Sequence, residues 1–197
     1  MTTTNGPTAP AGTTGWWNPG RFLLRRWPTA LGLGGALLAA GRGYSPELLA
    51  SLTEILVLLP LVYLLAVALR RRSATWPVLG GLVVVFVVLR VVGVVSPAAA
   101  FAGLALIVLV WGVVDQQLRR AGEFRVQSLG MVGFGLIALI GLVVEPDLGR
   151  YVVAAGWFLH GLWDFVHLRR DKVVVRSYAE TCGVLDLLVA VLLVLPR

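Results

Sequence analysis

Residues 46–69 read PELLASLTEILVLLPLVYLLAVAL, an apolar run in which only Glu47 and Glu54 carry a charge. At a helical rise of about 1.5 Å per residue, this run can span the roughly 30 Å hydrocarbon core of a bilayer. Of the whole 197-residue chain, 58% is hydrophobic and 14% is charged, with a mean hydropathy of +0.86. Since a soluble domain carries about 25% charged residues, the composition predicts an integral membrane protein and excludes a soluble or disordered chain.

Six further apolar segments predict an all-α, polytopic transmembrane helical bundle with seven spans. The first segment is short and rich in glycine, so it is either a short span, which tilted packing or a thinned bilayer accommodates, or a re-entrant piece. A polar N-terminal tail with an interfacial segment is expected over residues 1–26, including Trp16 and Trp17, and a transmembrane domain over residues 27–197. The predicted spans are 27–41, 46–69, 75–96, 98–117, 129–145, 150–168 and 178–196.

The chain has a net charge of +7, and its basic residues are unevenly distributed between the predicted loops. With seven spans, thirteen of the 17 Lys and Arg residues fall on one membrane face and three on the other, while Arg90 lies within a span. The positive-inside rule then predicts a multi-pass protein of the cell membrane with its N-terminus and basic loops in the cytoplasm. The basic excess therefore indicates topology, and no nucleic-acid partner is expected.

Ionisable side chains within the predicted spans are the candidate functional residues, because a charge inside a bilayer is costly unless it is paired, hydrated or neutralised. The densest group lies in segment 150–168. There His160, Asp164 and His167 are spaced i, i+4 and i+7, which places them on one stripe of the helix.

The last predicted span carries a matching stripe, Tyr178, Cys182 and Asp186, at steps of four residues. Counted from the basic loop between the two spans, Asp186 and His160 lie at nearly the same depth, about 13–15 Å from the cytoplasmic end. The short connection makes the two helices antiparallel neighbours. We therefore expect Asp186 to face the stripe that contains His160.

Three interpretations of this group remain open. It could hold a divalent metal such as Zn, Fe or Mn, since imidazole and carboxylate groups suit these ions. It could perform metal-free acid–base chemistry, with a buried carboxylic acid oriented by a histidine. It could also be an inert hydrogen-bonded lock between two helices. The candidate metal ligands are His160, Asp164, His167, Asp186 and Cys182.

A second charged pair is expected between the second and third spans. Counted from the arginines that separate these spans, Glu54 and Arg90 both lie about 24–27 Å from the cytoplasmic ends of antiparallel helices. Matched depth and opposite charge favour a Glu54–Arg90 ion pair. In the alternative, Glu54 faces a cavity, opened by a kink at Pro60, and Arg90 binds an anionic group such as a phosphate.

Two resemblances bear on function. The pattern over residues 157–190 resembles a group of small, uncharacterised bacterial membrane proteins and implies no activity; it comprises Trp157, His160, Trp163, Asp164, His167, Cys182 and Asp186. More loosely, seven spans with Glu54 on the second and Asp186 on the last resemble the integral membrane terpene cyclases. Those proteins have an essential Glu and an essential Asp on the corresponding spans.

The leading functional expectation is a membrane-embedded enzyme that acts on a hydrophobic isoprenoid or lipid substrate by acid–base chemistry. Asp186 or Glu54 would be the general acid, while His160 and Asp164 would set its proton. The side chains expected to contact substrate are Arg90, Trp157, Trp163, Phe165 and Tyr178. The alternatives are a metal-ion or proton-coupled transporter that uses the His/Asp/Cys group, and a non-catalytic scaffold. The expected partners are the lipid bilayer, a hydrophobic small molecule and, in a homo-oligomer, a second copy of the chain.

Overall fold

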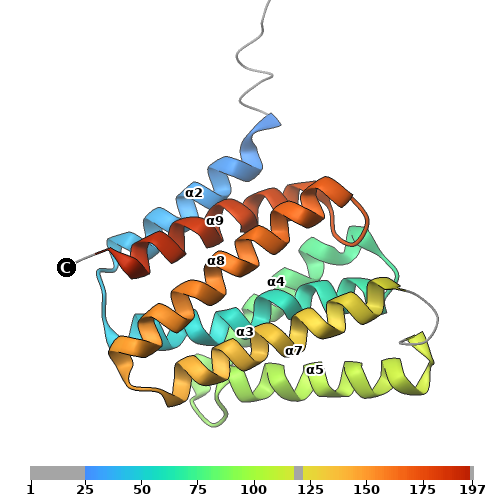
Figure 1. Ribbon diagram of the computed structural model, residues 1–197, viewed down its shortest axis with the longest axis horizontal. Coiled ribbons are helices and arrows are strands. Elements are labelled where there is room, and N and C mark those ends of the chain that lie inside the picture. The colour runs from blue at the N-terminus through green and yellow to red at the C-terminus, as the bar shows by residue number, and fades with distance from the viewer. Residues whose placement is uncertain (1–24, 118–121, 196–197) are drawn as a thin grey trace, which may run out of the picture.

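The computed structural model describes residues 25–117 and 122–195, and every regular element in these ranges is a helix (Figure 1). The expectation of an all-α fold is confirmed for this part of the chain. The expected interfacial residues Trp16 and Trp17 lie outside it. The helices are α2 (Trp27–Gly41), α3 (Pro46–Ala68), η1 (Arg72–Ala74), α4 (Thr75–Val92), α5 (Pro97–Val114), α7 (Gly122–Val143), α8 (Pro146–Arg170) and α9 (Arg176–Val194).

Each of the seven predicted segments overlaps one α-helix, and the differences lie at the ends. The segment expected to continue to residue 96 ends at Val92, because Gly93 takes a left-handed conformation with φ of 70°. The segment expected to begin at residue 129 begins at Gly122. Its first two turns contain the polar residues Gln127 and Ser128, and both side chains are buried.

Five of the helical segments are long and apolar enough to cross a membrane. Among the described residues these are Pro46–Ala68, Arg72–Val92, Pro97–Val114, Gly122–Val143 and Arg176–Val194. Helix α2 has only 15 residues. Helix α8 is long, with 25 residues, but it carries acidic and basic side chains at both ends and Asp164 in its interior. Large apolar side chains are exposed around the bundle, as the lipid-facing surface of a membrane protein requires.

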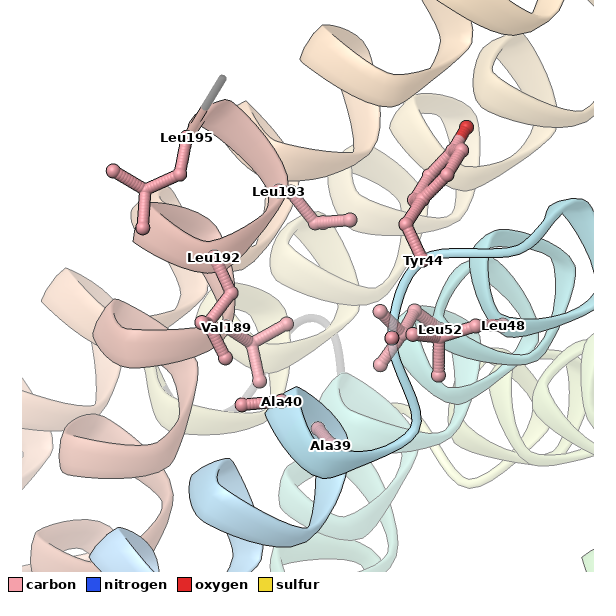
Figure 2. A pocket seen from close by; sticks show the side chains of 10 residues that line it. Ala39, Ala40, Tyr44, Leu48, Leu52, Val189, Leu192, Leu193 and Leu195 are labelled. Carbon is pink, nitrogen blue, oxygen red and sulfur yellow. The ribbon is translucent and has the colours of Figure 1, made fainter. Parts of the chain in front are cut away.

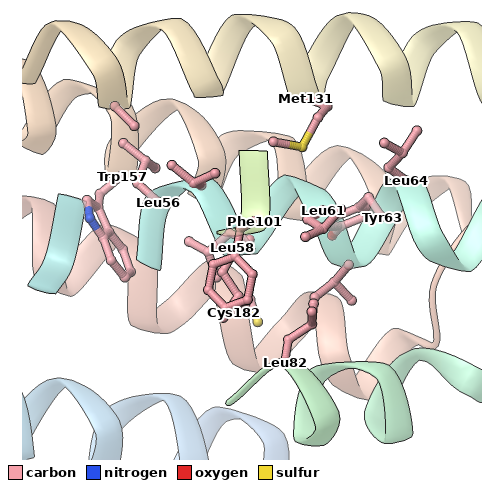
Figure 3. Close-up of a cluster of buried hydrophobic side chains, with 14 of the residues drawn as sticks. Leu56, Leu58, Leu61, Tyr63, Leu64, Leu82, Phe101, Met131, Trp157 and Cys182 are labelled. Carbon is pink, nitrogen blue, oxygen red and sulfur yellow. The ribbon is translucent and has the colours of Figure 1, made fainter. Parts of the chain in front are cut away.

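Helix α3 is the central element of the bundle (Figure 1). It packs against α4, α5, α7 and α8, and 72% of its span is buried, compared with 11% of Arg72–Val92. Helix α9 packs between α8 and α2. Figure 3 shows the resulting core, in which side chains of α3 such as Leu56 and Leu61 meet Phe101, Met131 and Trp157.

Local sequence features explain how the central helices are placed. Ser45 caps α3, since its Oγ accepts a hydrogen bond from the backbone N–H of Leu48 at 3.1 Å. The indole N–H of Trp157 donates to the carbonyl oxygen of Leu52 at 3.2 Å, which ties α8 to α3. Gly161 lets α8 and α9 approach closely, because a Cβ at this position would lie 3.2 Å from Cβ of Asp186. These contacts bring the polar stripes of α8 and α9 together.

Candidate functional site

Four polar side chains from three helices meet in the middle of the bundle. Helix α8 contributes His160 and Asp164, α9 contributes Asp186, and α3 contributes Tyr63. We call these four residues the His–Asp centre. All four are fully buried, with 0% relative exposure. The expectation that Asp186 faces His160 is confirmed, because the two side chains are in direct contact.

The ring nitrogen Nδ1 of His160 lies between the two carboxylates. It donates a hydrogen bond to Oδ2 of Asp186 at 2.7 Å and lies 3.5 Å from Oδ2 of Asp164. The phenol O–H of Tyr63 donates to Oδ1 of Asp164 at 2.5 Å. Each carboxylate is therefore held in place from a different helix. Sequence reasoning missed Tyr63, whose only signal was a single hydroxyl in an otherwise apolar stretch of α3.

Three atoms of the centre have no hydrogen-bond partner among the described residues. They are Nε2 of His160, Oδ2 of Asp164 and Oδ1 of Asp186. Buried polar groups in proteins are satisfied in the great majority of cases, so three exceptions at one place call for an explanation. The groups also fail to balance in charge, because two carboxylates face a single imidazole. With both carboxylates ionised and the imidazole neutral, either protons or a cation can offset the charge of the centre.

The donor set fits a metal ion. His160, Asp164 and Asp186 each offer one ligand atom, and these atoms lie within 4.8 Å of one another. One imidazole nitrogen and two carboxylate oxygens suit Zn, Fe or Mn. These three residues would hold the ion, while Tyr63 orients one of the carboxylate ligands from behind.

His167 and Cys182, which were expected as ligands, are not in this group. Nδ1 of His167 lies 2.9 Å from the carbonyl oxygen of Trp163, so Nδ1 carries the proton and donates it. Nε2 then accepts a hydrogen bond from the side-chain amide of Gln127 at 2.9 Å. Both ring nitrogens of His167 are thus engaged in linking α8 to α7. Cys182 is buried on α9, one turn before Asp186.

Aromatic rings surround the histidines. The ring centroids of Phe134 and His160 are 4.9 Å apart, and those of Tyr63 and His167 are 4.8 Å apart. Trp163, which was expected to contact a substrate, packs against both Phe134 and His167. These rings enclose the centre and keep its surroundings apolar.

The other three aromatic residues expected to contact a substrate are also packed against neighbouring side chains or backbone. The indole of Trp157 bonds to α3, as described above, and is 2% exposed. Phe165 lies against Gly183, where it covers the crossing of α8 and α9. Tyr178 is buried between Tyr63 and Trp76. As placed in this structure, all three consolidate the bundle.

The expected ion pair between Glu54 and Arg90 is confirmed, with Nε of Arg90 3.1 Å from Oε2 of Glu54. The guanidinium also donates through Nη2 to the hydroxyl of Ser51. The Glu54 side chain is 10% exposed and that of Arg90 is 37% exposed. This pair links α3 to α4, with Glu54 about two turns into α3 and Arg90 in the last turn of α4.

The two carboxylates that the terpene-cyclase likeness brings together, Glu54 and Asp186, belong to different sites. Glu54 and Tyr63 are nine residues apart on α3, which corresponds to about 13 Å along the axis and half a turn around it. Glu54 therefore faces α4, whereas Tyr63 faces the acidic groups of α8 and α9. The sequence left open whether the two carboxylates share a cavity. In the structure helix α3 lies between them, so they do not.

Hollows at the surface of the described bundle include the following four. The smallest, about 180 Å³, is lined by residues of α2, α3 and α9, including Leu52, Val189 and Leu193 (Figure 2). A second, about 520 Å³, runs between α8 and α9 and includes Phe158 and Ala190. Two of about 560 Å³ each lie between α2, α3 and α4, and between α3, α5 and α7. No member of the His–Asp centre lines any of these four.

Searches of protein-family models, curated proteins and solved structures found no match to this chain.

Proposed function

We propose that this protein is a seven-span membrane protein that binds a divalent metal ion at the His–Asp centre and couples its movement to protons. The five apolar helices support the membrane location. Helices α2 and α8 both pack along α9, so they would share the bilayer with those five. The distribution of basic residues favours a cytoplasmic N-terminus in the cell membrane.

The observation that carries the proposal is the excess of carboxylate over imidazole in a fully buried group. With both carboxylates ionised and the imidazole neutral, His160, Asp164 and Asp186 have a net charge of −2. One divalent cation brings that charge to zero, and so do two protons. An uncompensated charge in a low-dielectric interior is costly, so the centre favours these two loaded states. Exchange between them is the elementary step of a proton-coupled metal transporter.

The chemistry of the donor atoms limits which metal ions the centre would bind. Histidine with carboxylates favours Zn, Fe or Mn over Ca and Mg, which prefer all-oxygen sites. If Nδ1 of His160 were the ligand, it would give up its hydrogen bond to Asp186, because metal coordination needs the nitrogen lone pair. If Nε2 is the ligand instead, that hydrogen bond stays and orients the ring. Of the two ring nitrogens, Nε2 is the one without a hydrogen-bond partner among the described residues.

Metal content of the purified full-length protein tests the binding step. After treatment with a chelator and reloading with Zn, Mn or Fe(II), we expect one equivalent of metal per chain. Asp186→Asn and His160→Asn should weaken binding at least roughly tenfold, the effect typical of perturbing a metal site. Asp147→Asn is the matched control, since this exposed residue lies on α8 outside the centre. Metal retention equal in wild type and Asp186→Asn would contradict the proposal.

Reconstituted vesicles test the transport step. Metal entry should depend on an opposing pH gradient and should disappear in Asp164→Asn while persisting in Asp147→Asn. In addition, saturating metal should stabilise the folded protein by about 2.7 kcal/mol at a hundredfold excess over Kd. Metal binding without any flux would contradict the transport step and leave the centre as a metal site that does not move its ion across the membrane.

A second candidate, the enzyme acting on a hydrophobic substrate, is favoured by the hollow between α8 and α9. This hollow is apolar, and Ala190 on its wall lies one turn from Asp186. An isoprenoid or acyl chain bound there would end close to the His–Asp centre. Ala155→Phe, at an exposed position on the α8 wall, would fill the hollow. If the protein is an enzyme, this variant and Asp186→Asn should cause the same change in the membrane lipid profile of expressing cells.

A further inference from the structure

The hollow between α2, α3 and α4 lies at one end of the bundle and carries charges on its wall. It has a volume of about 560 Å³ and is formed by the end of α2, the beginning of α3 and the end of α4. Its charged lining residues are Arg42, Glu47 and Arg90. We call it the α2–α4 groove. Because three helix ends meet here, the groove lies at the boundary of the apolar spans, where lipid headgroups are found.

Arg90 is held in place for binding. Its Nε lies 3.1 Å from Oε2 of Glu54 in an ion pair, and its Nη2 donates to Ser51. Its guanidinium also lies 5.8 Å from the centroid of the Phe86 ring. A guanidinium has five N–H donors, so donors remain on the side that lines the groove. Its geometry matches two oxygens of a phosphate. Glu54 balances its charge and, being only 10% exposed, acts as the fixed support of the pair.

Arg42 and Glu47 supply one further charge of each sign. Both are exposed, and no ion pair within the described residues involves either of them. With Glu54 counted, the groove contains two positive and two negative charges and is neutral. A ligand with net negative charge would therefore meet an acidic side chain as well as the arginines. A ligand with both signs can satisfy them together.

The rest of the wall is apolar and continues towards the middle of the bundle. Leu52, Ile55 and Val87 line the groove below its charged rim. An aliphatic chain bound along these residues would leave its polar end beside the arginines. The groove thus presents the pattern that a phospholipid needs, with a polar mouth and an apolar floor.

We propose that the α2–α4 groove binds a phospholipid with an ethanolamine headgroup. The phosphate bonds to Arg90 and Arg42, and the primary ammonium donates to the carboxylate of Glu47. Three N–H donors distinguish this ammonium from the quaternary amine of choline, which has none. The glycerol headgroup of phosphatidylglycerol has no cation for Glu47. This site is independent of the His–Asp centre and of the metal proposed there.

Binding of soluble short-chain lipids to the delipidated full-length protein tests the proposal. The probes are phosphatidylethanolamine, phosphatidylcholine and phosphatidylglycerol, and bound lipid is counted by native mass spectrometry. We expect wild type to bind the ethanolamine lipid roughly threefold to tenfold more tightly than either of the others, the effect of one partly exposed charge contact.

Two exposed positions separate the contributions, with little risk to folding. Glu47→Gln should remove the preference for ethanolamine and leave choline binding unchanged. Arg42→Gln should weaken all three lipids by a similar factor, whereas Arg125→Gln, at an exposed arginine of α7 outside the groove, should change none. The proposal is overturned if phosphatidylglycerol binds as tightly as phosphatidylethanolamine. It is equally overturned if the ethanolamine preference survives in Glu47→Gln.

Discussion

Two groups of charged side chains lie on opposite faces of α3, and they differ in burial and in charge balance. The Glu54–Arg90 pair joins one acid to one base, and Arg90 is 37% exposed. The His–Asp centre joins two acids to one imidazole, and every member is fully buried. A partly exposed, balanced pair contributes little to the free energy of unfolding, and linking two helices is a sufficient role for it. A buried, unbalanced group is costly to maintain, and this cost is the best reason to assign it a function.

The largest expected effect comes from removing a carboxylate of the centre. Asp164→Ala leaves the Tyr63 hydroxyl without its acceptor and deprives His160 of one neighbouring charge. We expect a loss of about 3–5 kcal/mol in the free energy of unfolding, measured in detergent, because the change leaves a buried hydroxyl without an acceptor and a cavity beside it. Asp115→Ala is the control. Its carboxylate is 45% exposed and lies 3.7 Å from Arg70, so its loss should cost no more than about 1 kcal/mol.

Equal losses in the two variants would contradict the comparison, because burial would then not distinguish the two kinds of carboxylate. A stabilised Asp164→Ala protein would be informative in another way. It would show that the centre is kept at the expense of stability, which is the pattern expected of a functional site.

The second effect tests the hydrogen bond by which Tyr63 of α3 holds Asp164. Tyr63→Phe removes only the hydroxyl that donates to Asp164. A hydrogen bond to a charged group is worth about 1.5–3 kcal/mol, and we expect a loss in that range. The matched control is Tyr151→Phe, whose hydroxyl accepts from Arg150 at 2.7 Å on the surface. If both variants unfold at the same temperature, Tyr63 is not part of the centre in the folded protein.

The helices, and the side-chain pairs that lie at equal depth in the predicted spans, could be predicted from the sequence. Counting residues from the basic loops placed Glu54 beside Arg90 and Asp186 beside His160, and both contacts are present. This works because a helix has a fixed rise per residue, so equal distance from a loop means equal depth. The apolar runs likewise set where the helices lie.

The sequence was less informative about which face of a helix meets which neighbour. Tyr63 belongs to the centre because α3 turns that face towards α8, and no local signal in an apolar span reports such a rotation. Gln127 lay outside the predicted span 129–145, yet it is buried in α7 and bonds to His167. In both cases a partner distant in the chain decides the role of the residue.

The third effect concerns backbone spacing around the centre. A methyl group at Gly161 would lie 3.2 Å from Cβ of Asp186, which is held by its bond to His160. Gly161→Ala should therefore push α9 away from α8 and cost about 1–3 kcal/mol through overpacking. Gly81→Ala, on α4, meets nothing within 4 Å and should be neutral or stabilise the helix by up to about 1 kcal/mol. Thermal unfolding of the two proteins checks this, and a stabilised Gly161→Ala would show that the α8–α9 crossing is loose.

The smallest effect is expected at the Glu54–Arg90 pair itself. A double-mutant cycle with Glu54→Gln and Arg90→Gln should give a coupling energy of about 0.2–1 kcal/mol, because 37% of the Arg90 side chain is exposed. The coupling should also fall as salt is raised, since exposed charges are screened. In the centre, by contrast, the coupling between His160 and Asp186 should be insensitive to salt. A salt-independent coupling of several kcal/mol at Glu54 and Arg90 would mean that the bilayer shields this pair as completely as the bundle shields the centre. Burial inside the protein alone would then no longer separate the two groups, and Glu54 would regain its standing as a candidate functional acid.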